Sequence, residues 1–296
     1  LVVVKLKPAK QYLRDLHVIH NNSITYQSND LMMGIKYCIQ KAAELGLPLI
    51  VCISLGTNQG GHDGRTMLEE YINIISTYSS ICVVTAAGNE TTLSRHATVK
   101  FNDAITSHSI NVRVGPNELG FSLYIWGKTP DVFSVGIVTP SGESVQQIPA
   151  RLGQTDTISF ILEPTRIYIE YNIIEKRTGD PLILLRFTDP SEGIWTINLV
   201  KISGVNHPIH LWLPCCNLVT DNTYFIEANA DTTITVPGTA YLSITVGGYN
   251  HRTESAFIYS SRGNTRYNLQ NPDFIAPAVN VYGPLPNNSY GNLSGT

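Results

Sequence analysis

The spacing of apolar residues changes twice along the chain. In the first part, short apolar runs typical of strands buried on both faces alternate with segments in which apolar residues recur at the helical period. These segments are 1–6, 31–45, 49–53, 68–78 and 81–85. Buried strands that alternate with helices predict an α/β fold with a parallel sheet, right-handed crossovers and helices on both faces.

Polar residues at the segment ends predict where the two helices begin and end. Asp30 or Ser28 is expected to cap the first helix, and Gly46 follows its last apolar position. Asp63 is the expected cap of the second helix. Cys52 and Cys82 lie inside the apolar strands, so we expect them to be small buried side chains.

A different pattern occupies residues 98–231. The helical period is absent, and about eight short segments alternate apolar and polar residues, with turn residues such as Pro140-Ser141-Gly142 between them. This pattern predicts an all-β, jelly-roll-like sandwich. The buried-strand pattern then returns after residue 232. We therefore expect a discontinuous core of residues 1–97 and 232–296, interrupted by an insertion of residues 98–231.

Composition excludes several classes of function. The net charge is -3 and no Lys/Arg stripe is present, which argues against a nucleic-acid partner. No apolar run reaches the length of a membrane span, and no signal peptide is visible. The chain opens on an apolar run, so its start is expected to be a cut. Five cysteines without a Cys-x-x-Cys pair predict neither a metal site nor an oxidising compartment.

Three short segments outside the insertion carry the candidate chemistry. Ser54-Leu55-Gly56 and Ala86-Ala87-Gly88-Asn89 follow two of the predicted strands, and Ser294-Gly295-Thr296 follows Phe274-Ile275-Ala276-Pro277. In a parallel sheet, ligands bind outside the carboxyl ends of the strands. The first two segments lie at such ends, so they are the first candidates for a substrate site.

In their order and spacing, these segments resemble the subtilase family of serine proteases. The resemblance covers roughly residues 1–97 and 232–296. It implies that Asn89 is the oxyanion-hole donor, since an amide NH₂ stabilises the negative charge that grows on an attacked carbonyl. Ser54, Leu55 and Gly56 would pair with the substrate backbone, and Gly56, Ala87 and Gly88 would leave room for a substrate side chain.

The family's nucleophilic serine would follow Thr296 directly, and its Asp and His would precede Leu1. The resemblance therefore implies a peptide or protein substrate, a role for Thr296 beside the nucleophile, and no activity in residues 1–296 alone. The insertion further resembles clostridial-type subtilases, including spore-germination proteases, which implies a bacterial protein. Its compartment stays open between spore, envelope and cytoplasm. Calcium sites are common in the family, but none is legible here, and no other cofactor is evident.

Two alternatives remain beside the protease hypothesis. The chain could belong to a catalytically inactive relative, a pseudoprotease that binds or regulates a partner. The insertion could instead be a carbohydrate-binding module if its tryptophans form an exposed platform, although their alternating positions favour core packing. Those tryptophans are Trp126, Trp195 and Trp212.

The histidines give weaker signals. His62 lies beside Asp63 in a glycine-rich loop, and a substrate contact there is less expected than a role in loop structure. His96 is a similar case. Two histidine pairs have a spacing that could bind metal on a helix, but neither lies in a convincing helix and no third ligand is evident. The pairs are His17/His20 and His207/His210.

Overall fold

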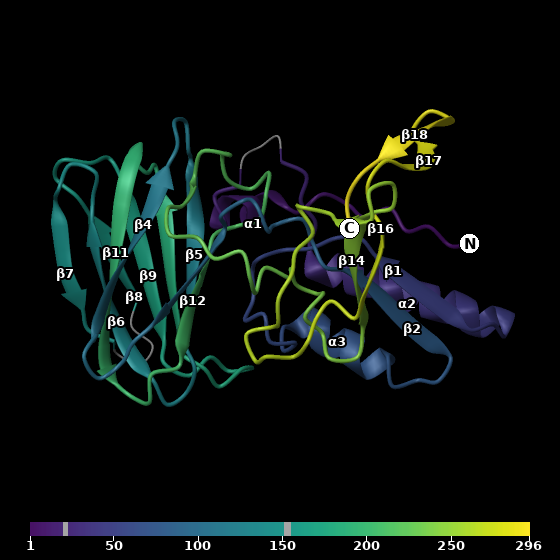
Figure 1. Ribbon diagram of the computed structural model, residues 1–296, viewed down its shortest axis with the longest axis horizontal. Coiled ribbons are helices and arrows are strands. Elements are labelled where there is room, and N and C mark those ends of the chain that lie inside the picture. The colour runs from purple at the N-terminus through teal and green to yellow at the C-terminus, as the bar shows by residue number, and fades with distance from the viewer. Residues whose placement is uncertain (20–22, 151–154) are drawn as a thin grey trace. The chain divides into compact units, whose positions relative to one another are not determined.

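The computed structural model describes residues 1–19, 23–150 and 155–296. The chain divides into two compact units (Figure 1). The first unit consists of Leu1–Pro8, Tyr26–Thr92 and Ala230–Thr296, and the second of Ala9–Thr25 and Leu93–Asn229.

The first unit is built on a mixed sheet of five strands. Strands β1, β2 and β14 lie side by side and run parallel, β16 also pairs in parallel with β14, and the short β15 pairs antiparallel. A separate hairpin, β17–β18, precedes the final residues. The elements are α2 (Ser28–Leu45), β1 (Leu49–Ile53), α3 (Met67–Ile75), β2 (Ile81–Ala86), β14 (Ile244–Asn250), β15 (Ser255–Ala256), β16 (Phe274–Pro277), β17 (Val281–Leu285) and β18 (Ser289–Leu293).

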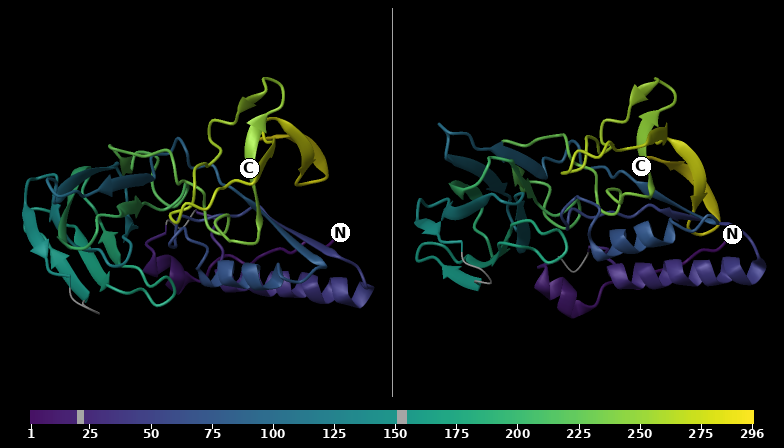
Figure 2. Two further views of the ribbon diagram at one scale, coloured as in Figure 1. Left: turned by 60° about the horizontal axis from the view of Figure 1, so that its bottom comes forward. Right: turned by 90° about the horizontal axis from the view of Figure 1, so that it is seen from below.

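Helices α2 and α3 lie on the same face of this sheet (Figure 2). Ile35 of α2 and Ile72 of α3 join one hydrophobic cluster with Val51, Ile53 and Val83 from the inward faces of β1 and β2. The opposite face of β1 is bare, because the side chain of Ile50 is 73% exposed. The alternation of side chains along a strand thus separates a covered face from an uncovered one.

The predicted α/β class is therefore wrong. Strands hold 36% of the residues and helices only 11%, so the chain is mostly β. Helices cover one face of the parallel strands rather than both. The apolar strand sequences suggested burial on both faces. Cys52 shows why this inference failed, since it is exposed on the bare face of β1, while Cys82 is only half-buried.

Several segment ends also differ from the prediction. Residues 1–6 form no strand, and most of their apolar side chains are exposed. Helix α2 begins at Ser28 without a side-chain cap and ends at Gly46, as predicted, in the left-handed conformation. Helix α3 is capped by Thr66 rather than by Asp63. Thr66 and Glu69 form a reciprocal capping box, whose Thr-x-x-Glu signature is legible in the sequence.

The second unit contains two antiparallel sheets around one hydrophobic core (Figure 1). Their strand orders are β3-β12-β5-β10-β9-β8 and β13-β4-β11-β6-β7. The elements are α1 (Gln11–Leu16), β3 (His96–Lys100), β4 (Ser107–Val114), β5 (Gly120–Trp126), β6 (Val132–Val138), β7 (Ser144–Ile148), β8 (Thr155–Ser159), β9 (Arg166–Asn172), β10 (Leu182–Thr188), β11 (Gly193–Ser203), β12 (Pro208–Trp212) and β13 (Tyr224–Phe225).

The tryptophans of this unit are core residues. Trp195 packs edge-on against Phe160 and Phe187, and its indole N–H donates to the carbonyl of Ser191 at 3.0 Å. Trp126 and Trp212 are buried as well. The three rings offer no exposed platform, so the carbohydrate-binding hypothesis loses the feature on which it rested.

Candidate functional site

The candidate site lies where β1 and β2 leave the sheet of the first unit. Their parallel register pairs Ile53 with Thr85, so the segments that follow the two strands start side by side. Strand β1 is the edge of the sheet, with β2 as its neighbour. Ser54, Leu55 and Gly56 continue this edge with exposed residues. An exposed edge segment of this kind can pair with an added extended peptide.

Asn89 and Thr296 are brought together by the fold, although 207 positions separate them. The backbone N–H of Thr296 donates to Asn89 Oδ1 at 3.1 Å, and the Thr296 hydroxyl donates to the same oxygen at 3.2 Å. The hydroxyl in turn accepts the backbone N–H of Gly88 at 3.1 Å. Thr296 therefore holds the side chain of Asn89 and the backbone beside it in one arrangement.

These contacts determine which way the Asn89 amide points. A backbone N–H can only donate, so the Asn89 atom that faces Thr296 N must be the carbonyl oxygen. The NH₂ group then lies on the other side of the amide. Among the described residues, none accepts a hydrogen bond from Nδ2 of Asn89. A Cβ added to Gly295 would lie 3.4 Å from Nδ2, so the glycine keeps side-chain atoms away from this donor.

The backbone on either side of Gly88 is tied to three other segments. The backbone N–H of Ala87 donates to the carbonyl of Val246 at 2.9 Å. The carbonyl of Ala87 accepts a hydrogen bond from the backbone N–H of Thr235, also at 2.9 Å. The carbonyl of Gly88 accepts Ser261 N–H at 2.7 Å, while Ser261 Oγ accepts Glu90 N–H at 2.9 Å. A donor carried on a backbone fixed at so many points needs little reorganisation when charge develops near it.

Gly88 cannot be replaced by a larger residue without strain. Its φ of 101° lies in the region that residues with a side chain rarely adopt. A Cβ at this position would also approach the side chain of Thr235 at 2.7 Å. The glycine that precedes Asn89 is thus required by the conformation of the turn and by the close approach of a third segment.

His62 is a buried structural residue. Its ring nitrogens face two backbone carbonyls, Ile234 at 2.8 Å and Asn58 at 3.1 Å. Burial lowers the pKa of His62 to about 4, in spite of these carbonyls. A neutral imidazole has one N–H, so it donates to one carbonyl only. A buried, neutral ring of this kind is not placed to contact a substrate.

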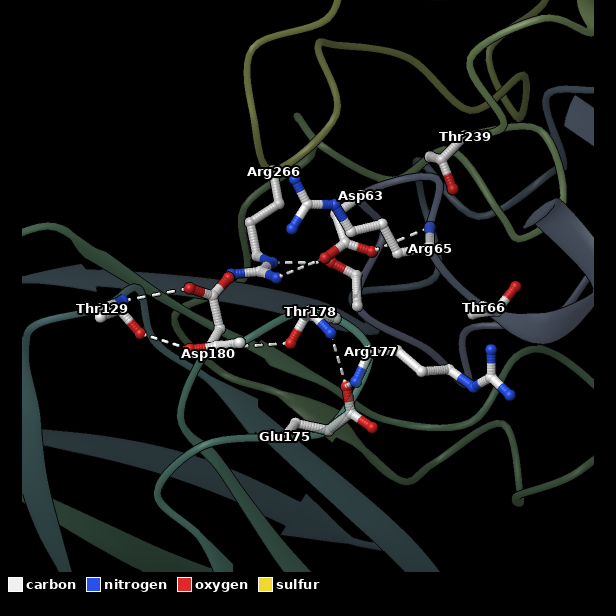
Figure 3. Close-up of polar contacts among 12 residues, drawn as sticks. Asp63, Arg65, Thr66, Thr129, Glu175, Arg177, Thr178, Asp180, Thr239 and Arg266 are labelled. Carbon is white, nitrogen blue, oxygen red and sulfur yellow. Dashed lines mark hydrogen bonds and ion pairs between the residues drawn. The ribbon is translucent and has the colours of Figure 1, made fainter.

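Asp63 belongs to a buried ion pair next to this loop (Figure 3). Arg266 Nη2 lies 2.9 Å from Asp63 Oδ2, and Arg266 Nε donates to the carbonyl of Gly61 at 2.7 Å. Its guanidinium also lies over the ring of Tyr267. The pair ties the loop after Ser54–Gly56 to the 265–268 turn, and so stabilises the scaffold of the site.

A second buried carboxyl, Glu69, lies in the capping box of α3. Its carboxyl group accepts a hydrogen bond from the hydroxyl of Thr66 at 2.8 Å and another from the hydroxyl of Thr239. Burial raises the pKa of Glu69 to about 7, and the nearby charge of Asp63 acts in the same direction. Because the folded-state pKa exceeds the ordinary value, the folded protein keeps this proton when the unfolded chain has lost it.

We expect stability to fall between about pH 4.5 and pH 7 because of Glu69. The stabilising contribution is complete below the unfolded-state pKa and is lost as pH rises through the folded-state pKa, with a total of roughly 3 kcal/mol. Glu69→Gln keeps the cap but removes the titration. The free energy of unfolding in urea should fall more between about pH 5 and about pH 8 in the wild type than in the variant. Equal decreases in both proteins would show that Glu69 is not the group that titrates in this range.

Among the described residues, the remaining histidines join no cluster of potential metal ligands. His96 Nε2 and His210 Nδ1 lie 3.0 Å apart in the second unit, and both rings stack with Trp212. His207 binds Asp131, and His20 lies outside the described residues. Within the described ranges, no group of three or more His, Cys, Asp or Glu side chains gathers to hold a metal ion.

Sequence reasoning missed two residues that shape the site. Thr235 and Ser261 both hydrogen-bond to the segment that carries Asn89. They come from loops far along the chain and match no motif, so no local signal marks them. Their positions follow only from the tertiary fold.

No helix in the described part of the chain has the length and apolar character needed to cross a membrane. No protein-family model matches the sequence, and no curated protein sequence matches it either. Among solved structures, the chain is similar to the CspB protease of Clostridium perfringens, with a TM-score of 0.84 and 26% identity over 93% of this chain. The match spans 57% of that protein's length. The structural comparison thus relates this chain to a protease.

Proposed function

We propose that this chain forms the oxyanion-stabilising and substrate-binding part of a serine-type endopeptidase of the subtilisin-like kind. Such an enzyme hydrolyses peptide bonds by transferring an acyl group to a serine. The resemblance of the sequence motifs and the structural similarity to CspB both support the proposal.

The orientation of Asn89 carries the proposal. Thr296 binds the amide oxygen and leaves the NH₂ group without a protein acceptor among the described residues. An amide donor that is held in place and lacks a partner is what a developing oxyanion requires. If Asn89 were only capping the following turn, its side chain would bond to nearby backbone N–H groups instead.

The neighbouring segment would hold the substrate. Ser54–Gly56 extends the edge of the sheet, so a peptide could pair with it and be led toward Asn89. The nucleophile, the histidine base and the carboxylate that orients it would come from the rest of such a protein, of which this chain spans part of the length.

The test uses the protein encoded by the complete gene and a fluorophosphonate probe, which labels activated serines. We expect labelling of one serine, and cleavage of peptides that is lost when this serine is replaced. A protein that binds peptides but is neither labelled nor active would instead be a pseudoprotease. Residues 1–296 expressed alone serve as the control and should show no turnover. Cleavage by this fragment would contradict the assignment of the catalytic groups.

A further inference from the structure

Two cysteines stand side by side in the second unit. Cys215 and Cys216 come shortly after Trp212, the last residue of β12, and both are partly exposed thiols. The remaining cysteines are each separated from the next by many residues. Only at 215–216 can one thiol therefore reach a second one across a single peptide bond.

The pair lies in a turn rather than in a strand of either sheet. The backbone N–H of Leu218 donates to the carbonyl of Cys215 at 3.2 Å and closes the turn, in which Asn217 has a φ of 68°. Such a turn can change its backbone angles without breaking hydrogen bonds between strands. The carbonyl of Asn217 accepts a hydrogen bond from the hydroxyl of Ser23, so the turn also holds a residue from the N-terminal part of this unit.

A polar group beside Cys216 suits the reactive form of its sulfur. The side-chain NH₂ group of Asn217 donates to Cys216 Sγ at 3.9 Å. An N–H donor binds a charged acceptor more strongly than a neutral one, and the thiolate is the form of cysteine that attacks a disulfide. Partial exposure lets a small disulfide reach the sulfur. We therefore expect Cys216 to react first.

We propose that Cys215 and Cys216 form a redox site, which a low-molecular-weight disulfide such as oxidised glutathione converts into a disulfide between neighbouring residues. The Cys216 thiolate attacks one sulfur of oxidised glutathione, and the sulfur–sulfur bond of glutathione breaks as one glutathione thiolate leaves. Cys215 then gives its proton to water and attacks Cys216 Sγ, so that the second glutathione leaves as a thiolate. Both leaving thiolates take up a proton. The two cysteines are thereby oxidised with loss of two hydrogens, while one oxidised glutathione is reduced to two molecules of glutathione.

The new bond is expected to be easily reduced. Neighbouring Cα atoms lie about 3.8 Å apart, whereas ordinary disulfides join Cα atoms about 4.4–6.8 Å apart. The bond therefore stores strain and has a higher reduction potential than a structural disulfide, so glutathione can open it again. Closing the ring also turns the peptide next to Asn217, whose carbonyl binds Ser23. Oxidation thus weakens, reversibly, the hold of this turn on Ser23.

The first experiment treats the reduced 1–296 chain with oxidised glutathione and measures peptide masses after cleavage by trypsin. The tryptic peptide 202–252 holds Cys215 and Cys216 and no other cysteine. In the wild type it should lose two hydrogens and carry no glutathione, whereas in Cys215→Ser and in Cys216→Ser it should carry one glutathione. Cys52, which is exposed and isolated, should carry one glutathione in the same sample. Reduced glutathione should restore both thiols of peptide 202–252.

A stable glutathione adduct on the wild-type peptide 202–252, or no reaction there while Cys52 reacts, would overturn the redox site. A second measurement follows the ¹⁵N-labelled chain by NMR. The amide signal of Ser23 should shift on oxidation and return on reduction. An unchanged Ser23 signal in a chain that has formed the disulfide would refute the coupling to Ser23. Neither measurement depends on peptidase activity.

Discussion

Replacing Asn89 by alanine should lower kcat of the proposed peptidase by about 10²–10³-fold, the loss measured when such a donor is removed from subtilisin. KM should stay within a few-fold, because the unpartnered NH₂ group acts on charge that exists only in the transition state. Steady-state kinetics on a peptide substrate measure both constants. Asn89→Asp should be at least as harmful, since a carboxylate repels the developing oxyanion.

Thr296 provides the matched control for this prediction. Its hydroxyl links Gly88 N–H to Asn89 Oδ1, whereas its backbone N–H holds Asn89 by itself. Thr296→Val should therefore lower kcat less than Asn89→Ala does, and Thr296→Ser should restore it. Thermal unfolding of every variant separates catalytic effects from misfolding. Wild-type kcat in Asn89→Ala would remove the oxyanion assignment.

Arg266→Ala should destabilise the first unit by about 3–5 kcal/mol, the usual cost of removing one partner of a buried ion pair. The side chains of Arg266 and Asp63 are 3% and 0% exposed, so the variant leaves a buried carboxylate without its cation. The free energy of unfolding in urea measures the loss. Adding Asp63→Asn to Arg266→Ala should recover part of it, because the double variant no longer buries an unpaired charge.

Lys41→Ala is the comparison at an exposed pair. Lys41 and Glu44 lie 2.6 Å apart on α2, but their side chains are 39% and 60% exposed. Water and salt weaken such a pair, so its removal should cost far less stability than Arg266→Ala does. Losses of similar size for Arg266→Ala and Lys41→Ala would show that the loop around His62 and Asp63 does not depend on this ion pair.

Local signals in the sequence located much of the first unit. The helical period and Gly46 predicted the helix that ends at residue 45, and the apolar runs predicted β1 and β2. Such features depend on residues close together in the chain, whose period and turn chemistry can be read directly. The capping-box spacing of Thr66 and Glu69 also marks the start of α3, so the predicted cap, Asp63, was wrong.

Burial was harder to predict than secondary structure. An apolar strand sequence does not reveal whether one face or both are covered, and Ile50 and Cys52 are exposed on a face without helices. Asp63 was predicted to cap a helix because aspartate is a common cap residue. Its actual partner, Arg266, lies 203 positions away and cannot be inferred from the local sequence. In both cases the missing information was a contact, or the lack of one, with a distant part of the chain.

The sequence alone determined the candidate site residues: the amide of Asn89 after one strand, the edge segment Ser54–Gly56 after another, and Thr296. Only the tertiary structure decided how these residues lie relative to one another. It turned the Asn89 oxygen toward Thr296 and placed Thr235 between Gly56 and Gly88. The physical reason is that strand ends and turns follow from local backbone preferences, whereas the direction of a donor and the space beside a glycine depend on side chains brought together from distant segments.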